Sequence, residues 1–259
     1  MNPAADFPKK RFGQHFLKDP NTARIVVSGV MAEDVVLEVG PGRGFLTVFL
    51  AQRANLVHAV EIDPDLLPAL RGAVGSLYNV RIHKGDALRF DYSGLVPAPN
   101  RLAANLPYNV ASPLILRLLE EVESLKTLRF MVQLEVARRM AAQRRTKDYG
   151  AYAVLAQLLA RVGILHRVPP TVFDPPPRVH SAVVEMNRVE PPEDYYRLKD
   201  LVLGAFKSRR KRLVNNLPEP AQAVAPRVLH SLGYGSNARA EELAPEDFVA
   251  LYRALSWAL

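Results

Sequence analysis

Short apolar segments alternate with helix-like segments along most of the chain, and this alternation is the strongest constraint on its fold. The spacing predicts strands at residues 35–39, 56–62, 80–84, 101–104, 128–134 and 164–168. Helical patterns separate most of these segments, and helical crossovers are the usual connection between consecutive parallel strands. The sequence therefore predicts an α/β protein built around a mainly parallel, doubly wound sheet.

Polar or glycine-rich loops follow the predicted strands. Gly40–Gly44 follows the first strand, Glu61 ends the second, Asp86 follows the third and Asn105 follows the fourth. Right-handed crossovers place the strand-to-helix loops of such a sheet at one edge. We therefore expect these loops to form a single cleft, at the edge where open α/β sheets bind ligands.

Clusters of proline interrupt the pattern at residues 169–170, 175–177 and 191–192. Beyond the last cluster the sequence predicts helices only, at about residues 193–206, 208–216, 222–231 and 245–257. We predict two domains: residues 1–190, with a basic lead-in before the sheet, and a small all-helical domain at residues 191–259.

The glycine-rich loop has the character of a nucleotide-type loop. Glycines allow a sharp turn and a close approach to a ligand, so Gly40 and Gly42 are candidate cofactor-binding residues. Glu61 is expected to accept hydrogen bonds from both hydroxyls of a ribose, and Asp86 from an adenine amino group. Helix capping is the structural alternative for each acid. The third glycine stands two residues after the second, whereas nicotinamide loops have three, so we favour S-adenosylmethionine (AdoMet) as the cofactor.

The tetrapeptide Asn105-Leu106-Pro107-Tyr108 combines hydrogen-bond acceptors with an aromatic face. Pro107 restricts the backbone of Leu106 and so helps to fix the direction of its carbonyl. Two fixed acceptors beside a flat ring suit an exocyclic amine such as that of adenine. The alternative is a strand-to-helix turn with an Asn cap and a packed tyrosine.

The chain carries a net charge of +8, which indicates a polyanionic partner, nucleic acid ahead of a membrane surface. Basic residues are concentrated in three runs, of which residues 9–11 are the shortest. We predict RNA contacts by the other two runs, although such runs also occur on solvated faces: Arg138, Arg139, Arg144, Arg145, Lys207, Arg209, Arg210, Lys211 and Arg212.

Other classes of site and location lack support in the sequence. There is no cysteine, so neither disulfides nor thiolate metal sites are expected. The six histidines show no metal-ligand spacing, and we expect no metal. No apolar stretch has the length of a membrane span, and no secretory signal pattern is present. We expect a cytoplasmic monomer.

Five motifs together carry a family resemblance. They are Arg11-Phe-Gly-Gln-His-Phe-Leu17, Glu38-Val-Gly-Pro-Gly-Arg-Gly44, Asn105-Leu-Pro-Tyr108, Phe173-Asp-Pro-Pro-Pro-Arg-Val-His-Ser181 and Arg209-Arg-Lys-Arg-Leu-Val-Asn-Asn-Leu217. In this order, and across essentially the whole chain, they resemble the KsgA/Dim-type ribosomal RNA adenine dimethyltransferases. The resemblance implies a Rossmann-like fold. It also implies AdoMet-dependent conversion of two adjacent adenosines near the 3′ end of 16S RNA to N(6),N(6)-dimethyladenosine, with a role in small-subunit biogenesis.

The resemblance also assigns residues. The AdoMet contacts of the family fall on His15, Leu17, Gly40, Glu61, Asp86 and Asn105. The family usually has asparagine at the position of His15, and either side chain can donate or accept a hydrogen bond. For catalysis we expect Asn105 Oδ1 and the Leu106 carbonyl to accept from the target amine. Tyr108 would stack on the base, and Phe173 would close the other face.

Two alternatives remain at this point. A related methyltransferase that acts on large-subunit RNA shares the tetrapeptide pattern, often with isoleucine as its second residue. Leu106 and the run Arg209–Leu217 favour the small-subunit enzyme. The second alternative is a non-catalytic ribosome assembly or transcription factor on the same scaffold. The intact glycine loop, Glu61, Asp86 and the tetrapeptide argue against it.

Overall fold

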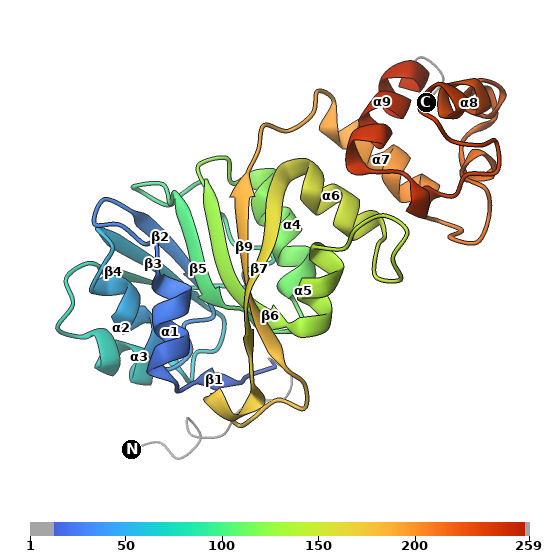
Figure 1. Ribbon diagram of the computed structural model, residues 1–259. Helices are drawn as coiled ribbons and strands as arrows, with labels where there is room; N and C mark the ends of the chain where they lie inside the picture. Colours follow the sequence, from blue (N-terminus) through green and yellow to red (C-terminus); the bar gives the residue numbers. More distant parts are fainter. Residues whose placement is uncertain (1–12, 257–259) are drawn as a thin grey trace. The chain divides into compact units, whose positions relative to one another are not determined.

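The computed structural model describes residues 13–256. These residues contain a seven-stranded sheet, and Figure 1 shows helices packed around it. The strand order is β4-β3-β2-β5-β6-β9-β7, with β2 to β6 parallel and β9 antiparallel to β6. The strands are β2 (Val35–Val39), β3 (Leu56–Glu61), β4 (Val80–Lys84), β5 (Arg101–Asn105), β6 (Thr127–Gln133), β7 (Ala160–Val168) and β9 (Ser181–Arg188). The predicted doubly wound α/β fold is confirmed.

Helices connect the parallel strands. They are α2 (Phe45–Ala51) between β2 and β3, α3 (Leu67–Val74) between β3 and β4, and α4 (Ala111–Glu121) between β5 and β6. Helix α1 (Pro20–Val27) precedes β2, and α5 (Leu134–Met140) follows β6. The connection through α2 moves from β2 toward one end of the sheet, and the connection through α4 moves from β5 toward the other. Right-handed crossovers therefore place α2 and α4 on opposite faces, and the strand order reverses between β2 and β5.

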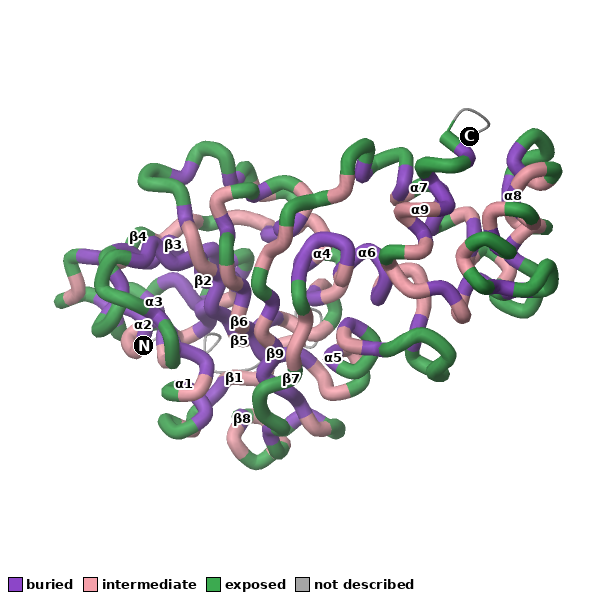
Figure 2. The backbone as a smooth tube through the Cα atoms, turned by 45° about the horizontal axis from the view of Figure 1, so that its top comes forward, coloured by how far each residue is buried: buried purple, intermediate pink, exposed green. Residues whose placement is uncertain are grey.

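Strands β2 and β3 are buried along their whole length (Figure 2). A parallel strand covered on both faces reads as a continuous apolar run instead of an alternating one. The sequences VVLEV and LVHAVE follow this rule except for Glu38, His58 and Glu61, which are buried polar residues. Two of these exceptions, Glu38 and Glu61, lie at the carboxyl ends of their strands.

The lead-in before α1 joins the sheet domain through a second, two-stranded sheet. Strand β1 (Phe16–Leu17) pairs antiparallel with β8 (Phe173–Asp174), which follows the short 3₁₀ helix η3 (Pro170–Val172). Lys18 N–H also donates to the Val172 carbonyl at 2.9 Å. These hydrogen bonds hold residues 16–18 against a segment that is distant in sequence.

The chain divides into two compact units, residues 1–137 with 162–188, and residues 138–161 with 189–259. The second unit is helical and contains α6 (Ala151–Leu159), α7 (Tyr195–Ala205), α8 (Glu219–Ser231), α9 (Pro245–Leu255) and the 3₁₀ helices η4 (Leu213–Asn216) and η5 (Ala240–Glu242). Its second segment begins close to the predicted boundary at residue 190. Unlike the prediction, this unit also includes residues 138–161.

The expected helix at residues 208–216 is wrong, because only Leu213–Asn216 form a 3₁₀ helix. Like charges three and four residues apart destabilise a helix, and residues 207–212 contain five cations. In addition, Asn216 Nδ2 donates to the carbonyls of Ala205 (2.7 Å) and Ser208 (3.3 Å). This side chain thereby satisfies carbonyl groups near the end of α7 and stabilises a turn in place of a helix.

Candidate active site

A cavity of about 790 Å³ lies at the carboxyl ends of β2, β3 and β5, within the first unit. Its volume is in the range of small-molecule and cofactor sites. With the exception of Phe173, every residue predicted to bind cofactor or target base lines this cavity: His15, Leu17, Gly40, Gly42, Glu61, Asp86, Asn105, Leu106, Pro107 and Tyr108. The predicted grouping of the strand-end loops into one cleft therefore agrees with the structure.

The glycine loop (residues 40–44) packs against the tetrapeptide and against the lead-in segment before α1. Gly40 and Gly42 have φ angles of +70° and +61°, a region that glycine adopts readily. A Cβ atom on Gly40 would lie 3.2 Å from Pro107 Cδ, and one on Gly42 would lie 3.0 Å from the Phe16 ring. Glycine at these two positions thus allows the loop, the tetrapeptide and the lead-in to approach one another.

Glu61 is the last residue of β3, and its carboxylate holds the glycine loop by a hydrogen bond. Its Oε2 accepts from the Gly42 N–H at 3.0 Å and its Oε1 from the Asp63 N–H at 2.8 Å. Burial raises the pKa of Glu61, and these two hydrogen bonds act in the opposite direction. Each carboxylate oxygen retains a further lone pair that can accept a hydroxyl. Glu61 does not cap the helix that follows, so the capping alternative does not apply to it.

Asp86 lines the same cavity beyond β4. Its Oδ1 accepts from the Leu88 N–H at 3.0 Å, which forms a local turn of the type that aspartate favours. A local structural role of this kind therefore accounts for one carboxylate oxygen of Asp86, Oδ1. A contact between Asp86 and an adenine amino group stays a prediction.

The side-chain amide of Asn105 has a hydrogen-bond partner for its nitrogen but none for its oxygen. Its Nδ2 donates to the His15 carbonyl at 3.0 Å, while its Oδ1 is buried without a hydrogen-bond partner. An Asn cap would need this oxygen to accept from a backbone amide of the following turn, and it accepts from none. A buried acceptor without a partner costs about 1–3 kcal/mol, which suggests that a donor from a ligand completes the site.

Tyr108 is held at its hydroxyl and on one face of its ring. The hydroxyl lies 2.5 Å from Ser181 Oγ, a fully buried atom at the start of β9. The His15 ring stacks on Tyr108 with a centroid separation of 5.4 Å and an interplanar angle of 29°. Burial raises the pKa of the Tyr108 hydroxyl, so it remains protonated at neutral pH.

The expectation for Phe173 is not met in this structure. Phe173 is fully buried and packs in the core of the first unit, together with Leu17 and Val183. Successive residues of a strand point to opposite sides, and Asp174, the other residue of β8, lines the cavity instead. Phe173 is therefore a core residue in this structure, and Tyr108 has the His15 ring as its aromatic neighbour.

Sequence reasoning missed Glu38 and Gln14 as residues of the site. Glu38 lines the cavity, its Oε2 has no hydrogen-bond partner, and burial with a contribution from Glu61 raises its pKa to about 8. Its position as the acidic residue within an apolar strand was an available signal. Gln14 Nε2 donates to Asp63 Oδ2 at 2.9 Å and so anchors the lead-in beside Glu61. No sequence feature near Gln14 indicated this contact, because Asp63 lies 49 residues further along the chain.

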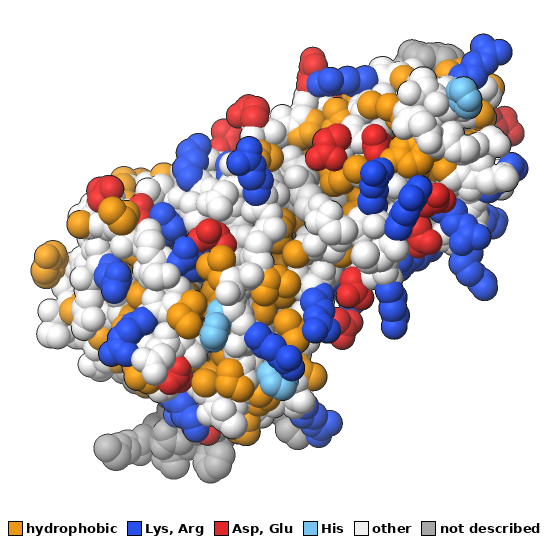
Figure 3. All heavy atoms as spheres, viewed as in Figure 1, with side chains coloured by type: hydrophobic (Ala, Val, Ile, Leu, Met, Phe, Trp, Pro, Cys, Tyr) orange, Lys and Arg blue, Asp and Glu red, His pale blue; other side chains and the backbone are white. Residues whose placement is uncertain are grey.

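The predicted RNA-binding residues all lie in the second unit and are all exposed. Several Lys and Arg side chains project from this unit in Figure 3. The two runs adjoin η5: Arg209 pairs with Glu241 at 2.6 Å and donates to the Thr146 carbonyl at 3.2 Å, and Arg145 lies 3.9 Å from Glu242. The run at residues 9–11 lies outside the described residues.

Other basic side chains of these runs have no acidic partner among residues 13–256. They are Arg138, Lys207, Arg210 and Lys211. A cation without an internal partner remains available to a phosphate. The fold thus concentrates unpaired positive charge in the helical unit.

Comparison with known proteins gives a consistent assignment. The family described as ribosomal RNA adenine dimethylase matches residues 6–256. The chain is 70% identical over 250 residues to ribosomal RNA small subunit methyltransferase A of Rubrobacter xylanophilus, covering 96% of this chain and 95% of that protein. It is 39% identical over 254 residues to the protein of the same name from Neisseria gonorrhoeae, covering 96% of each.

Solved structures show the same fold. A dimethyladenosine transferase from Plasmodium falciparum superposes with a TM-score of 0.82 at 24% identity, covering 94% of this chain and 98% of that one. The 23S rRNA methyltransferase ErmE superposes with a TM-score of 0.73 at 29% identity, covering 93% and 99%. With its matched sequence spanning both units, the chain belongs to the ribosomal RNA adenine dimethylase family.

Proposed function

We propose that this protein transfers methyl groups from AdoMet to the exocyclic amines of two adjacent adenosines near the 3′ end of 16S RNA. The product is N(6),N(6)-dimethyladenosine. The observation that carries the proposal is the buried, unpartnered Asn105 Oδ1, in a cavity shared with Gly40, Glu61 and Asp86. The relative with 70% identity, named as a small-subunit methyltransferase, supports the choice of substrate.

The residues of the cavity fit AdoMet. Gly40 and Gly42 line the cavity where the amino-acid part of AdoMet would lie, and the remaining lone pairs of the Glu61 carboxylate suit its ribose hydroxyls. Asp86 would accept from the adenine amino group of AdoMet, and Leu17 and the backbone of His15 would border the cofactor from the lead-in. When bound, AdoMet supplies an electrophilic methyl group on a sulfonium centre.

The tetrapeptide orients the target amine. Asn105 Oδ1 and the Leu106 carbonyl accept its two N–H groups, which directs the nitrogen lone pair out of the ring plane. The bond from Asn105 Nδ2 to the His15 carbonyl keeps the oxygen of the amide, and not its nitrogen, toward this position. Both acceptors become stronger partners as the amine gains positive charge, so they stabilise the transition state more than the ground state. No strong base is required, and much of the rate arises from positioning.

The target adenosine reaches the cavity from a loop or by flipping out of a helix. Tyr108 provides the stacking surface for the base. The exposed cations of the second unit contact phosphates of the RNA. We further propose that the substrate is a small ribosomal subunit or its precursor, and that the protein acts as a monomer in the cytoplasm. No helix within residues 13–256 has the length and apolar character needed to cross a membrane.

A second candidate is methylation of large-subunit RNA. The similarity to the 23S rRNA methyltransferase ErmE, at 29% identity over most of the chain, supports this second candidate. A non-catalytic assembly factor on the same scaffold is a third candidate, which an absence of AdoMet binding would favour.

The deciding experiment is methyl transfer from labelled AdoMet to small subunits that lack the modification, with large subunits in parallel and mass identification of the nucleoside. We expect dimethyladenosine in small-subunit RNA alone. Label in large-subunit RNA would shift the assignment to the second candidate. Absence of both label and AdoMet binding would leave an RNA-binding scaffold.

A further inference from the structure

His15 makes contacts with the tetrapeptide through both its backbone and its ring. Its carbonyl accepts from Asn105 Nδ2 at 3.0 Å, and its ring stacks on Tyr108. Its Nδ1 lies 2.7 Å from the Pro175 carbonyl. A carbonyl can only accept, so Nδ1 carries the hydrogen and donates it. The ring is thereby anchored to the segment that follows β8.

Tyr108 depends on His15 for part of its orientation. The bond to Ser181 Oγ fixes the hydroxyl end of the Tyr108 side chain. A single bond at one end still permits the ring to rock about its long axis, and the stacked imidazole restricts that motion. A stacking surface that is already immobile loses less entropy when a base binds to it.

We propose that the His15 ring is a positioning group that backs one face of Tyr108, so that the target adenine stacks on the other face. This inference rests on the proposed function and deepens it. It assigns the His15 ring to the base-binding half of the cavity, whereas its backbone carbonyl orients Asn105 whatever the side chain is. Tyr108 itself lines the cavity and is only partly buried, so part of its ring remains open to a base.

Three variants separate the ring from its hydrogen bond. His15→Phe keeps a flat ring and loses the bond to the Pro175 carbonyl, His15→Asn keeps an N–H donor and loses the ring, and His15→Ala loses both. With small subunits as substrate, we expect kcat about tenfold lower for the Ala and Asn variants and within about twofold of wild type for Phe. The Kd for AdoMet should stay unchanged in all three. His166→Ala, which removes an exposed histidine on β7, is the matched control.

A second measurement needs no methyl transfer. In protein labelled with 3-fluorotyrosine, the Tyr108 resonance is identified by its loss in Tyr108→Phe. We expect His15→Ala and His15→Asn to shift and narrow this resonance, as the ring gains mobility, and His15→Phe to leave it near its wild-type position. These spectra test the positioning role even if the wild-type protein methylates neither subunit, which would overturn the proposed function alone.

Several results would overturn the inference. Faster turnover by His15→Ala would mean that the ring obstructs the base. Weaker AdoMet binding by this variant, with an unmoved Tyr108 resonance, would return the ring to the cofactor half of the cavity. Wild-type behaviour of His15→Asn combined with a poor His15→Phe would show that the hydrogen bond, not the ring, is what matters.

Discussion

At the scale of single residues, the site consists of groups whose hydrogen bonding is left incomplete. Asn105 Oδ1 and Glu38 Oε2 are both buried at the cavity without partners. Buried polar groups are nearly always paired, so two such atoms in one cavity indicate that a ligand supplies the missing hydrogen-bond partners. Only Glu38 can ionise, and this difference gives each residue its own test.

Replacing Asn105 by Ala should abolish most of the methyl transfer. Loss of one positioned hydrogen-bonding group of this kind reduces kcat by about 100-fold or more. The variant should stay folded and still bind AdoMet, with a higher Kd because Asn105 is itself a predicted AdoMet contact, so kcat is compared at saturating AdoMet. Calorimetric binding and thermal unfolding serve as controls, and turnover at the wild-type rate in a folded variant would remove Asn105 from the mechanism.

Glu38 should make the stability of the AdoMet-free protein depend on pH. Its pKa rises from the ordinary 4.5 to about 8 on folding, so between these values the folded state holds a proton that the unfolded state has released. Its contribution is full below pH 4.5 and is lost as pH rises toward 8. From pH 5 to pH 8 the wild type should lose about 3–4 kcal/mol relative to Glu38→Gln.

Urea unfolding at the two pH values measures this difference. The exposed Glu33→Gln, just before β2, is the control and should follow wild type. Equal pH dependence of wild type and Glu38→Gln would show that Glu38 is already ionised in the folded protein.

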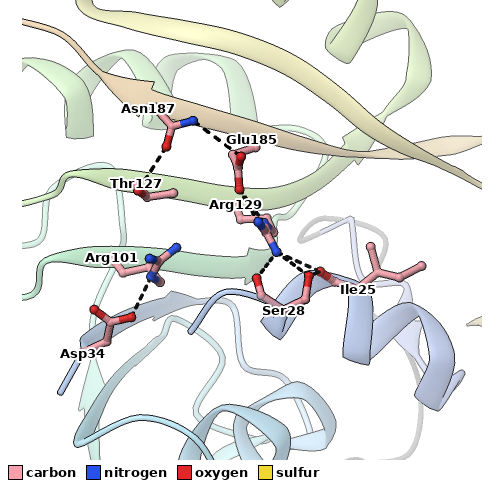
Figure 4. Close-up of polar contacts among 8 residues, drawn as sticks. All are labelled: Ile25, Ser28, Asp34, Arg101, Thr127, Arg129, Glu185 and Asn187. Atoms are coloured by element: carbon pink, nitrogen blue, oxygen red, sulfur yellow. Dashed lines mark hydrogen bonds and ion pairs between the residues drawn. The ribbon is translucent and has the colours of Figure 1, made fainter. Parts of the chain in front are cut away.

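At the scale of elements, hydrogen bonds fix both ends of α1, the helix that follows the lead-in. A fixed α1 limits the movement of the lead-in. Asp19 Oδ2 accepts from the Thr22 N–H at 2.6 Å and caps the start of the helix. At the other end Arg129 of β6 donates to the carbonyls of Ile25 and Ser28 and pairs with Glu185 of β9 (Figure 4). This network lies toward the amino ends of the parallel strands, opposite the cavity.

Arg129→Ala should destabilise the protein by about 3 kcal/mol. The substitution leaves Glu185 partly buried without its cation and removes the donor from the end of α1. A double variant, Arg129→Met with Glu185→Leu, should recover much of the loss because no unpaired charge remains. Urea unfolding of both is the measurement, with the exposed Arg71→Ala of α3 as control. A double variant no more stable than Arg129→Ala would contradict this account.

At the scale of the whole molecule, the candidate active site and the predicted RNA-contacting cations belong to different units. The cavity is built within the first unit, while the predicted RNA-contacting cations belong to the second. The net charge of +8 is therefore expected to act mainly through the helical unit. Two of its unpaired cations, Arg210 and Lys211, are adjacent and exposed.

The double variant Arg210→Ala with Lys211→Ala should weaken RNA binding and lower its salt dependence. Each lost phosphate contact reduces the slope of log K against log salt by roughly 0.7–0.9, so the slope should change by about 1.5. AdoMet affinity should not change. Binding titrations over a salt series provide the measurement, and Arg53→Ala with Arg71→Ala, exposed cations of the first unit, provide the matched control. Equal slopes in the two double variants would refute a specific role for the second unit.

The fold class, the edge of the sheet where the cavity lies and ten of the residues that line it followed from the sequence. Apolar runs, glycines and strand-ending acids act locally, so their patterns could be recognised without the tertiary structure. The helix expected at residues 208–216 failed because a charge run and Asn216 prevailed over helix propensity.

Only the tertiary structure decided how Asn105 and Tyr108 are oriented and where Phe173 lies. Asn105 is oriented by the backbone carbonyl of His15, and every residue has a carbonyl, so no pattern of side chains announces that contact. Phe173 and Asp174 are adjacent, and the pairing of β8 with β1 determined which of them faces the core and which the cavity. Contacts between distant segments depend on register and on backbone groups, and these exist only once the chain has folded.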